Sequence, residues 1–228
     1  MKTVNQWIWI AALSGLVSGV VGAAELYVDL FDGAAGVPLN GRVPNTAPAG
    51  ISWEAMGNGT AWMADGTIAT QAVNQNRNAF LPFVPESGKI YELSLEMNPE
   101  GPVAGDFFAL GFASNNKLSD AFVTNQGMAV SPWMFVSASG LVRTYTGPGN
   151  AGNVAAASPD GGWAKPVSAK IVLDTSADPW SVEWFVNGQS VRSHKFYTGN
   201  PEISYVTFGR FRRASGTVRN FKLSVLSK

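Results

Sequence analysis

Side chains able to perform acid–base or nucleophilic chemistry are sparse in this chain of 228 residues, which has one histidine and no cysteine. Without cysteine there is no thiolate nucleophile, disulfide or zinc–thiolate site. The single histidine, His194, lies in the run Arg192-Ser-His-Lys-Phe196, and the sequence contains no Gly-x-Ser-x-Gly motif. We therefore interpret His194 as a surface histidine on a strand rather than as a catalytic base.

Carboxylates are more numerous, but their spacing does not indicate a catalytic pair. Glycoside hydrolysis needs two carboxyl groups about 5 to 5.5 Å apart for retention, or roughly 6.5 to 9.5 Å apart for inversion. Glu92 and Glu96 share one face of a predicted strand, yet they lie roughly 13 Å apart along it. We therefore interpret Glu92 and Glu96 as part of a solvated strand face rather than as a catalytic pair. Glu183 lies mid-strand among apolar residues. A catalytic role for Glu183 or Glu96 is kept as an alternative.

Sugar binding is the chemistry that fits the remaining side chains best, because sugar C–H faces stack on aromatic rings while polar groups bind the hydroxyls. The chain contains 8 Trp, 5 Tyr and 13 Phe. Alternation in Leu141-Val-Arg-Thr-Tyr145 puts two polar side chains on one face. We predict a glycan-facing patch of Trp133, Arg143, Tyr145 and Trp163, with burial in the core as the alternative for each tryptophan.

Calcium is the one cofactor that the sequence leaves open. It takes about six to eight oxygen ligands from carboxylates, amides and backbone carbonyls. Candidate oxygens occur in Ser114-Asn-Asn116 with Asp120, and in Asp174-Thr-Ser-Ala-Asp178. Neither stretch has a dense Asp-x-Asp-x-Asp spacing, and turn formation explains both equally well. We keep Asp174 and Asp178 as candidate calcium ligands.

Nucleic acid is not expected as a partner, because 16 Lys plus Arg balance 16 Asp plus Glu and leave no excess to neutralise phosphates. Basic residues gather in Arg210-Phe-Arg-Arg213, with Arg219 and Lys222 following. Two interpretations stay open for this run. It is either a solvated strand whose charges guard against aggregation, or a patch for an acidic polysaccharide.

The first residues have the layout of a secretory signal peptide. Lys2 is followed by an uncharged apolar run from Trp7 to Val21, which closes on the small residues Gly22-Ala23-Ala24. The apolar run is shorter than the roughly 20 residues that span a bilayer. We therefore predict cleavage of residues 1–24, an exported or periplasmic protein, and no membrane span in the mature chain.

From residue 25 onward the pattern is that of β-strands separated by turns. Short apolar or alternating runs recur between Gly, Pro, Asn and Asp, and no segment has a convincing helical period apart from one turn at Leu118–Phe122. Strands are predicted at Leu26–Phe31, Ile51–Glu54, Thr67–Ala72, Ala79–Val84, Ile90–Met97, Phe107–Ala113, Met128–Ser137, Leu141–Tyr145, Ala169–Asp174, Ser181–Val186, Gln189–Phe196, Ile203–Phe211 and Thr217–Leu226.

These strands predict an all-β fold with two packed antiparallel sheets in a jelly-roll sandwich, forming one domain over residues 25–228. The run Ile90–Met97 alternates apolar and polar residues, as a strand with one buried face requires. Phe107–Ala113 is apolar on both faces and is expected to be a central strand. Asp65-Gly66 and Asn187-Gly188 are strong hairpin signals, and Ser215-Gly216 is a weaker one. The first and last strands are expected to pair.

The C-terminal third contains four motifs in order: Ile171-Val-Leu-Asp-Thr175, Trp180-Ser-Val-Glu-Trp-Phe-Val-Asn-Gly188, Val206-Thr-Phe-Gly209 and Gly216-Thr-Val-Arg-Asn-Phe-Lys-Leu223. This order resembles the concanavalin A-like lectin/glucanase superfamily, especially the LamG-like modules of secreted bacterial proteins. These motifs specify hairpins and core faces, so they imply the fold of residues 25–228 more than an activity. The Glu-x-Asp-x-x-Glu strand of the glucanase branch and the Gln-x-His of jelly-roll lyases are absent here.

The resemblance and the residues together favour a secreted, non-catalytic module that binds a polysaccharide or a cell-surface glycan. A polysaccharide-cleaving enzyme of the same fold is the first alternative. An extracellular structural or assembly protein, whose exposed aromatic residues meet another chain, is the second.

Overall fold

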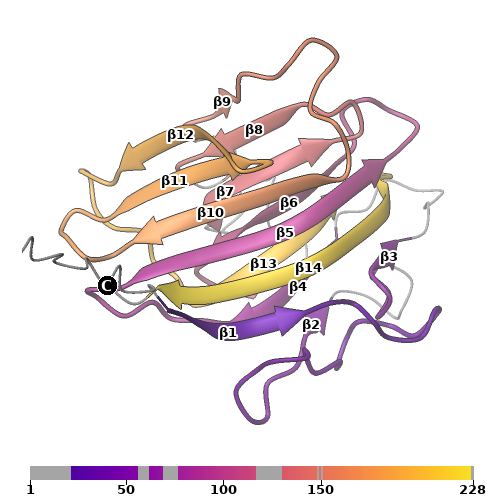
Figure 1. The fold of residues 1–228 in the computed structure, drawn as a ribbon, viewed down its shortest axis with the longest axis horizontal. Helices are drawn as coiled ribbons and strands as arrows, with labels where there is room; N and C mark the ends of the chain where they lie inside the picture. The colour runs from indigo at the N-terminus through magenta and orange to yellow at the C-terminus, as the bar shows by residue number, and fades with distance from the viewer. Residues whose placement is uncertain are drawn as a thin grey trace, which may run out of the picture.

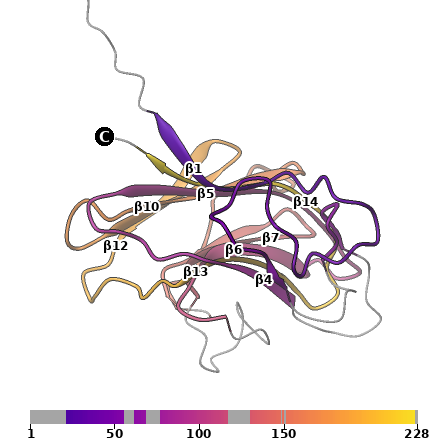
Figure 2. The same ribbon diagram turned by 90° about the horizontal axis from the view of Figure 1, so that it is seen from below.

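The chain forms two antiparallel β-sheets that pack face to face (Figures 1 and 2). The computed structural model describes residues 22–55, 62–68, 77–116, 130–147, 149 and 151–226. Its strands confirm the predicted all-β jelly-roll sandwich. Among the described residues, no helix is long and apolar enough to cross a membrane. The predicted helical turn at Leu118–Phe122 lies outside these residues.

The first sheet has the strand order β1-β14-β5-β10-β11-β12, and β3 also pairs with β14. Its strands are β1 (Ala23–Asp29), β3 (Thr67–Ile68), β5 (Ile90–Glu100), β10 (Val167–Asp174), β11 (Ser181–Val186), β12 (Gln189–Lys195) and β14 (Ser215–Leu226). In β5 buried and partly exposed residues alternate, as the sequence predicted. This sheet therefore has one face in the core and one face in solvent.

The second sheet has the order β2-β4-β13-β6-β7-β8-β9. Its strands are β2 (Glu54–Ala55), β4 (Arg77–Pro82), β6 (Phe107–Ala113), β7 (Val130–Ser137), β8 (Val142–Tyr145), β9 (Val154–Ala155) and β13 (Tyr205–Phe211). Every residue of β6 is buried, and β6 lies between β13 and β7. The predicted central strand is thus confirmed. The short strand β9 lies in a stretch where the sequence predicted no strand.

The two terminal strands lie side by side, with Ala23 opposite Leu226 and Asp29 opposite Phe221 (Figure 1). This confirms the predicted pairing of the first and last strands. Because β1 begins at Ala23, it includes the last two residues of the predicted signal peptide. Cleavage after Ala24 stays a prediction.

Backbone geometry confirms the hairpin predicted at Asn187-Gly188 and contradicts the turn predicted at Ser215-Gly216. Asn187 and Gly188, which join β11 to β12, both have positive φ (49° and 80°), as a type I′ turn requires. Ser215-Gly216 is no turn, because both residues lie inside β14. The chain turns earlier, where Arg212 has a φ of 56°. Gly216 is needed in the strand for another reason, since a Cβ there would lie 2.0 Å from the Asn98 carbonyl oxygen.

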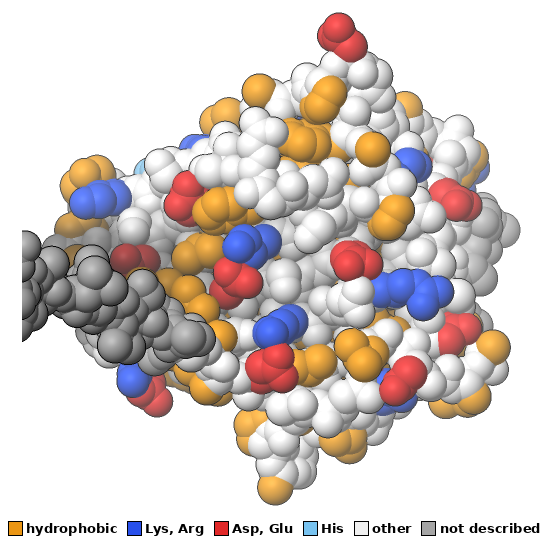
Figure 3. All heavy atoms as spheres, viewed as in Figure 1, with side chains coloured by type: hydrophobic (Ala, Val, Ile, Leu, Met, Phe, Trp, Pro, Cys, Tyr) orange, Lys and Arg blue, Asp and Glu red, His pale blue; other side chains and the backbone are white. Residues whose placement is uncertain are grey.

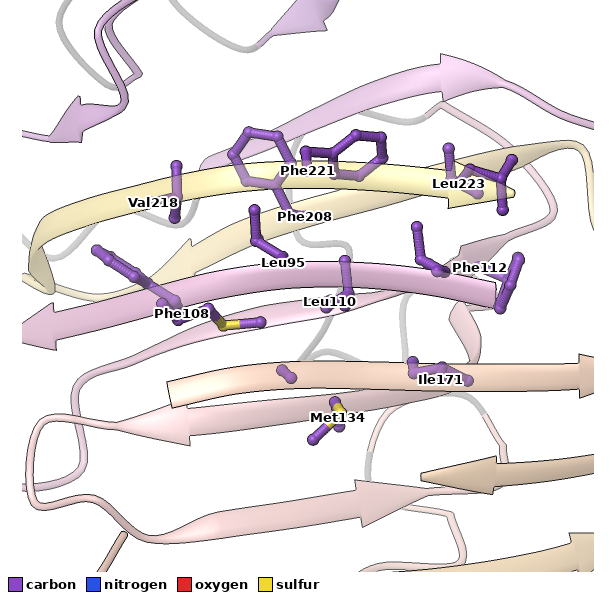
Figure 4. Close-up of a cluster of buried hydrophobic side chains, with 14 of the residues drawn as sticks. Leu95, Phe108, Leu110, Phe112, Met134, Ile171, Phe208, Val218, Phe221 and Leu223 are labelled. Atoms are coloured by element: carbon purple, nitrogen blue, oxygen red, sulfur yellow. The ribbon is translucent and has the colours of Figure 1, made fainter. Parts of the chain in front are cut away.

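The core fills the space between the sheets with alternate side chains from both (Figure 4). Leu95, Ile171 and Phe221 come from the first sheet, and they face Leu110 and Phe208 of the second. Such interdigitation removes a large apolar area from water, which is the main favourable contribution to folding. A polar contact also joins the layers, because the Trp184 indole N–H donates to the Trp133 carbonyl at 3.1 Å.

A buried carboxylate fixes the long connection between β1 and β2. Asp29 is completely buried and accepts hydrogen bonds from the Trp53 indole at 2.8 Å and the Phe31 amide at 2.9 Å. The guanidinium of Arg42 completes the set, 3.1 Å from Asp29 and also bonded to Asp32. A buried charge is tolerated only when it is paired and hydrogen-bonded in this way.

Replacing Arg42 by Ala therefore removes the counter-ion of a buried carboxylate. We expect Arg42→Ala to lower the free energy of unfolding by about 3 kcal/mol, measured by urea denaturation. Lys222→Ala is the matched control, because Lys222 pairs with Glu25 at 2.6 Å on the exposed face, where such a pair contributes about 0 to 1 kcal/mol. Equal losses in the two variants would contradict this assignment.

Candidate functional site

The outer face of the second sheet, directed away from the sandwich core, carries a layer of aromatic side chains. We call this set the aromatic face. Its members alternate along the strands with the residues that enter the core. The buried members are Phe80, Phe107, Ala109, Ala113, Trp133, Phe135 and Tyr145, and Tyr205 and Phe211 pack against them partly exposed.

The rings of the aromatic face stack in a regular order set by strand pairing. Trp133 lies directly opposite Tyr145 in the β7–β8 ladder, and their rings are parallel within 6° at 3.8 Å between centroids. Phe107 stacks on Phe135 at 4.3 Å and on Phe211 at 4.7 Å. Stacked pairs of this kind stabilise a fixed ring geometry beyond the area they bury. The layer is therefore a rigid platform.

Gly111 in β6 leaves room for the side chain of Trp133 on the neighbouring strand β7. Gly111 pairs with Trp133, and a Cβ at Gly111 would lie 2.5 Å from the Trp133 Cβ. Only a residue without a side chain fits at that distance. The indole nitrogen of Trp133 donates to the Gly147 carbonyl at 3.1 Å, which fixes the ring from its other edge.

Three of the four residues predicted to form a glycan-facing patch come together here. Arg143 is paired with Phe135, so it shares the aromatic face with Trp133 and Tyr145. The two rings are not exposed, however, because Trp133 and Tyr145 retain only 1% and 3% of their accessible surface. Trp163 lies elsewhere, in the core between the sheets, and is 8% exposed. Ligand binding by these residues stays a prediction.

Polar groups surround the rings of the aromatic face. Glu54 of β2 is paired with Phe80, and its carboxylate accepts a hydrogen bond from the Asn116 side-chain amide at 2.6 Å. Among the described residues, two buried polar atoms of this face have no hydrogen-bond partner, Arg143 Nε and Thr207 Oγ1. Buried polar atoms are normally satisfied, so each of these two atoms, on strands separated by β6 and β7, is a hydrogen-bonding group that a ligand oxygen can complete.

Glu54 was missed by the sequence reasoning, although it is the one carboxylate that the described strands place on the aromatic face. The only local signal is its position between Trp53 and Ala55, which are both buried. Its neighbours on the face come from β4 and from the segment after β6, far away in the sequence. Long-range pairing therefore determines its environment, and no local pattern could reveal it.

The other carboxylates considered for catalysis lie on the outer face of the first sheet. Glu92 forms an ion pair with Lys170 at 2.9 Å, which confirms a solvated face for this residue. Glu96 is opposite Ser168 of β10, whereas Glu183 is opposite Val172. These two partners are roughly 13 Å apart along β10. The structure therefore does not bring Glu96 and Glu183 together.

The candidate calcium ligands are engaged in turns. One oxygen of Asp174 accepts the Ser176 amide at 2.8 Å, and one oxygen of Asp178 accepts the Asn200 side chain at 3.1 Å. Nowhere in the described ranges do three His, Asp or Glu side chains gather in a way that could hold a metal ion. The two carboxylates alone supply fewer oxygens than the roughly six to eight that calcium takes, so they do not form a complete site. Calcium binding stays a prediction.

The basic run from Arg210 to Arg213 is not a solvated strand throughout. Arg210 is almost completely buried on the core side of β13, where its guanidinium donates to the Ala214 carbonyl at 3.2 Å. Burial, assisted by the nearby charge of Arg77, lowers the pKa of Arg210 to about 10. The solvated-strand interpretation is therefore wrong for Arg210. Because its side chain is buried, Arg210 is also not available to a surface patch for an acidic polysaccharide.

Comparison with known structures identifies the class of fold. The chain is similar to an endo-1,3-beta-glucanase from Streptomyces sioyaensis, with a TM-score of 0.57 and 13% identity over 91% of this chain and 98% of that one. It is also similar to the carbohydrate recognition domain of Emp47p, with a TM-score of 0.50 and 12% identity over 84% and 94%. No family model matches the sequence, and no curated protein is similar to it.

The fold is that of the concanavalin A-like lectins and glucanases, as the sequence motifs suggested. Both the glucanase and the recognition domain use this one architecture, and at these identities the similarity establishes the fold alone. Whether a member binds or cleaves is decided by the side chains on the sheet, and these differ from one protein to the next.

The buried phenol of Tyr145 predicts a pH effect. Burial raises its pKa above the ordinary value of 10.0, although the charge and hydrogen bond of Arg143 act in the opposite direction. A raised pKa in the folded state supports stability below pH 10, and this contribution is lost as the pH rises through the folded value. Relative to wild type, we expect Tyr145→Phe to gain stability above pH 10.

The measurement is thermal unfolding of both proteins between pH 8 and pH 11. Tyr197→Phe is the control, because Tyr197 is 78% exposed. A difference between wild type and Tyr145→Phe that stays constant over this range would show that the Tyr145 phenol is not buried.

Proposed function

We propose that this protein is a secreted, non-catalytic module that binds a polysaccharide or a cell-surface glycan through the aromatic face. The observation that carries the proposal is the combination of a rigid stacked layer with partly exposed polar groups around it. On the described strands of that face, Glu54, Arg143 and Tyr205 are the partly exposed polar residues.

The chemistry of these groups suits a sugar. A pyranose presents apolar C–H faces and hydroxyl groups, which aromatic rings and polar side chains bind respectively. Tyr205 lies edge-on to Phe80 at 6.0 Å between ring centroids, and Phe80 is paired with Glu54, whose carboxylate accepts a hydrogen bond from the Asn116 amide in the segment after β6. The unsatisfied Nε of Arg143 and hydroxyl of Thr207 add hydrogen-bonding groups on the same face.

The distribution of carboxylates supports binding over cleavage. Glycoside hydrolysis requires two carboxyl groups within roughly 10 Å of one another, and the described part of the aromatic face has Glu54 alone. A single carboxylate accepts hydrogen bonds from sugar hydroxyls, but it does not provide both an acid and a nucleophile or base. Secretion is part of the proposal because of the signal-peptide pattern in residues 1–24.

The test is a polysaccharide pull-down and glycan array with the purified protein, with and without calcium, followed by an assay for released reducing sugar. We expect binding without release. Arg143→Ala and Tyr205→Ala are each expected to weaken binding by about 5- to 20-fold, the range for losing one well-placed contact. Lys222→Ala, on the other sheet, is the matched control and should bind as wild type does.

Other outcomes assign other functions. Release of reducing sugar that Glu54→Gln abolishes would overturn the non-catalytic proposal in favour of an enzyme. Absence of binding to every glycan, combined with capture of a protein partner that Arg143→Ala disrupts, would favour the structural or assembly alternative.

A further inference from the structure

The outer face of the first sheet holds a groove that is separate from the aromatic face. It has a volume of about 520 Å³ and crosses β10, β11 and β12 near the end where β5 begins. Its lining includes Ile90, Val172, Asp174, Glu183, Lys195 and Tyr197. Figure 3 shows this side of the molecule, where acidic and basic side chains lie among apolar ones.

The charged groups of the groove lack ion-pair partners among the described residues, unlike Glu92 and Glu25 beside it, although the Ser176 amide donates to Asp174 and the Ser190 hydroxyl donates to Glu183. On the same sheet face, Glu92 is neutralised by Lys170 at 2.9 Å and Glu25 by Lys222 at 2.6 Å. Asp174, Glu183 and Lys195 form no ion pair with any described residue. Strand pairing sets Asp174 opposite Ser181, and Ser181 opposite Lys195, so these groups share one row. The groove thus combines acceptors and a donor with an apolar floor.

An exposed aromatic ring stands at the rim of this groove. Tyr197 keeps 78% of its accessible surface, the largest fraction of any aromatic residue in the described part of the chain. Its backbone is nevertheless fixed, because the Tyr197 amide donates to Lys195 and the next turn closes from Gly199 to Phe196 at 3.0 Å. Phe196 is buried and anchors the turn in the core. A fixed backbone with a free ring is a preformed stacking platform.

The balance of charge restricts what the groove can take. Two carboxylates and one lysine line it together with His194, whose pKa is lowered by burial and by the neighbouring charge of Arg192. An acidic sugar would therefore meet two unpaired carboxylates. A sugar without acidic groups would place hydroxyls on Asp174 and Glu183 and a C–H face on Tyr197.

From this arrangement we propose that the groove is a second glycan site, specific for sugars that lack acidic groups. It goes beyond the aromatic face in both position and specificity. Asp174 and Glu183 accept hydrogen bonds from sugar hydroxyls, Lys195 donates, and Tyr197 stacks on the ring. The two sites lie on opposite outer faces of the sandwich, so the groove can bind whether or not the aromatic face does.

The experiment is a glycan array of neutral and uronic-acid oligosaccharides, followed by isothermal titration calorimetry with the neutral oligosaccharide that binds best. We expect Tyr197→Ala to weaken binding at one class of site by about tenfold, which corresponds to about 1.4 kcal/mol. Asp174→Asn is expected to weaken it less and to relax the exclusion of acidic sugars. Val84→Ala is the matched control, because Val84 is an exposed side chain that does not line the groove.

Each outcome decides between the two sites. Loss of binding on Tyr197→Ala, with Arg143→Ala unchanged, supports the groove and contradicts the aromatic face. Loss on Arg143→Ala, with Tyr197→Ala unchanged, overturns the groove and supports the aromatic face. Binding of uronic-acid chains in preference to neutral ones, or of no neutral sugar at all, also overturns the groove.

Discussion

The structure depends on a sheet that is apolar on both faces. Every residue of β6 is buried, and its neighbours β7 and β13 alternate between the sandwich core and the aromatic face. A strand of this kind has no side to turn toward water, so the sheet requires apolar contacts on each face. The first sheet supplies one set, across the core. Stacked rings supply the other, where Trp133 on Tyr145 and Phe107 on Phe135 place flat surfaces against each other.

The first sheet is built on the opposite rule and provides a different kind of surface. In β5 and β10, one residue enters the core and the next faces solvent. The outer side of this sheet therefore carries carboxylates, lysines and hydroxyls. Two pairs of these charges neutralise one another across neighbouring strands, Glu92 with Lys170 and Glu25 with Lys222. Where β11 and β12 reach the end of the sheet, Asp174, Glu183 and Lys195 lie beside Tyr197 without an ion-pair partner among the described residues. One sheet thus carries a rigid layer of buried rings with Tyr205 and Phe211 partly exposed, and the other offers hydrogen-bonding groups in a groove.

Local sequence pattern predicts most of this fold, since the information lies in alternation and turn chemistry. Ile90–Met97 shows its buried face directly, and Asn187-Gly188 is a hairpin because two consecutive positive φ angles suit those residues. Alternation also places Arg143 and Tyr145 on one face. It does not reveal whether that face meets the core, solvent or a second apolar layer, so Tyr145 is buried where exposure was expected. Trp163 and Arg210 differ from expectation for the same reason, because their burial comes from strands distant in sequence.

The separation of the two outer faces has a consequence for how such a protein would act. Packed sheets are spaced about 10 Å apart, and the aromatic face and the groove are divided by both sheets and the core between them. One sugar unit cannot contact both faces. A single glycan would have to pass around an edge of the sandwich, either at β12 and β9 or at β1 and β2. If both proposed surfaces bind, two separate glycans would occupy them at once without interfering. A sandwich with a binding surface on each side would then bridge chains of a polysaccharide rather than enclose one.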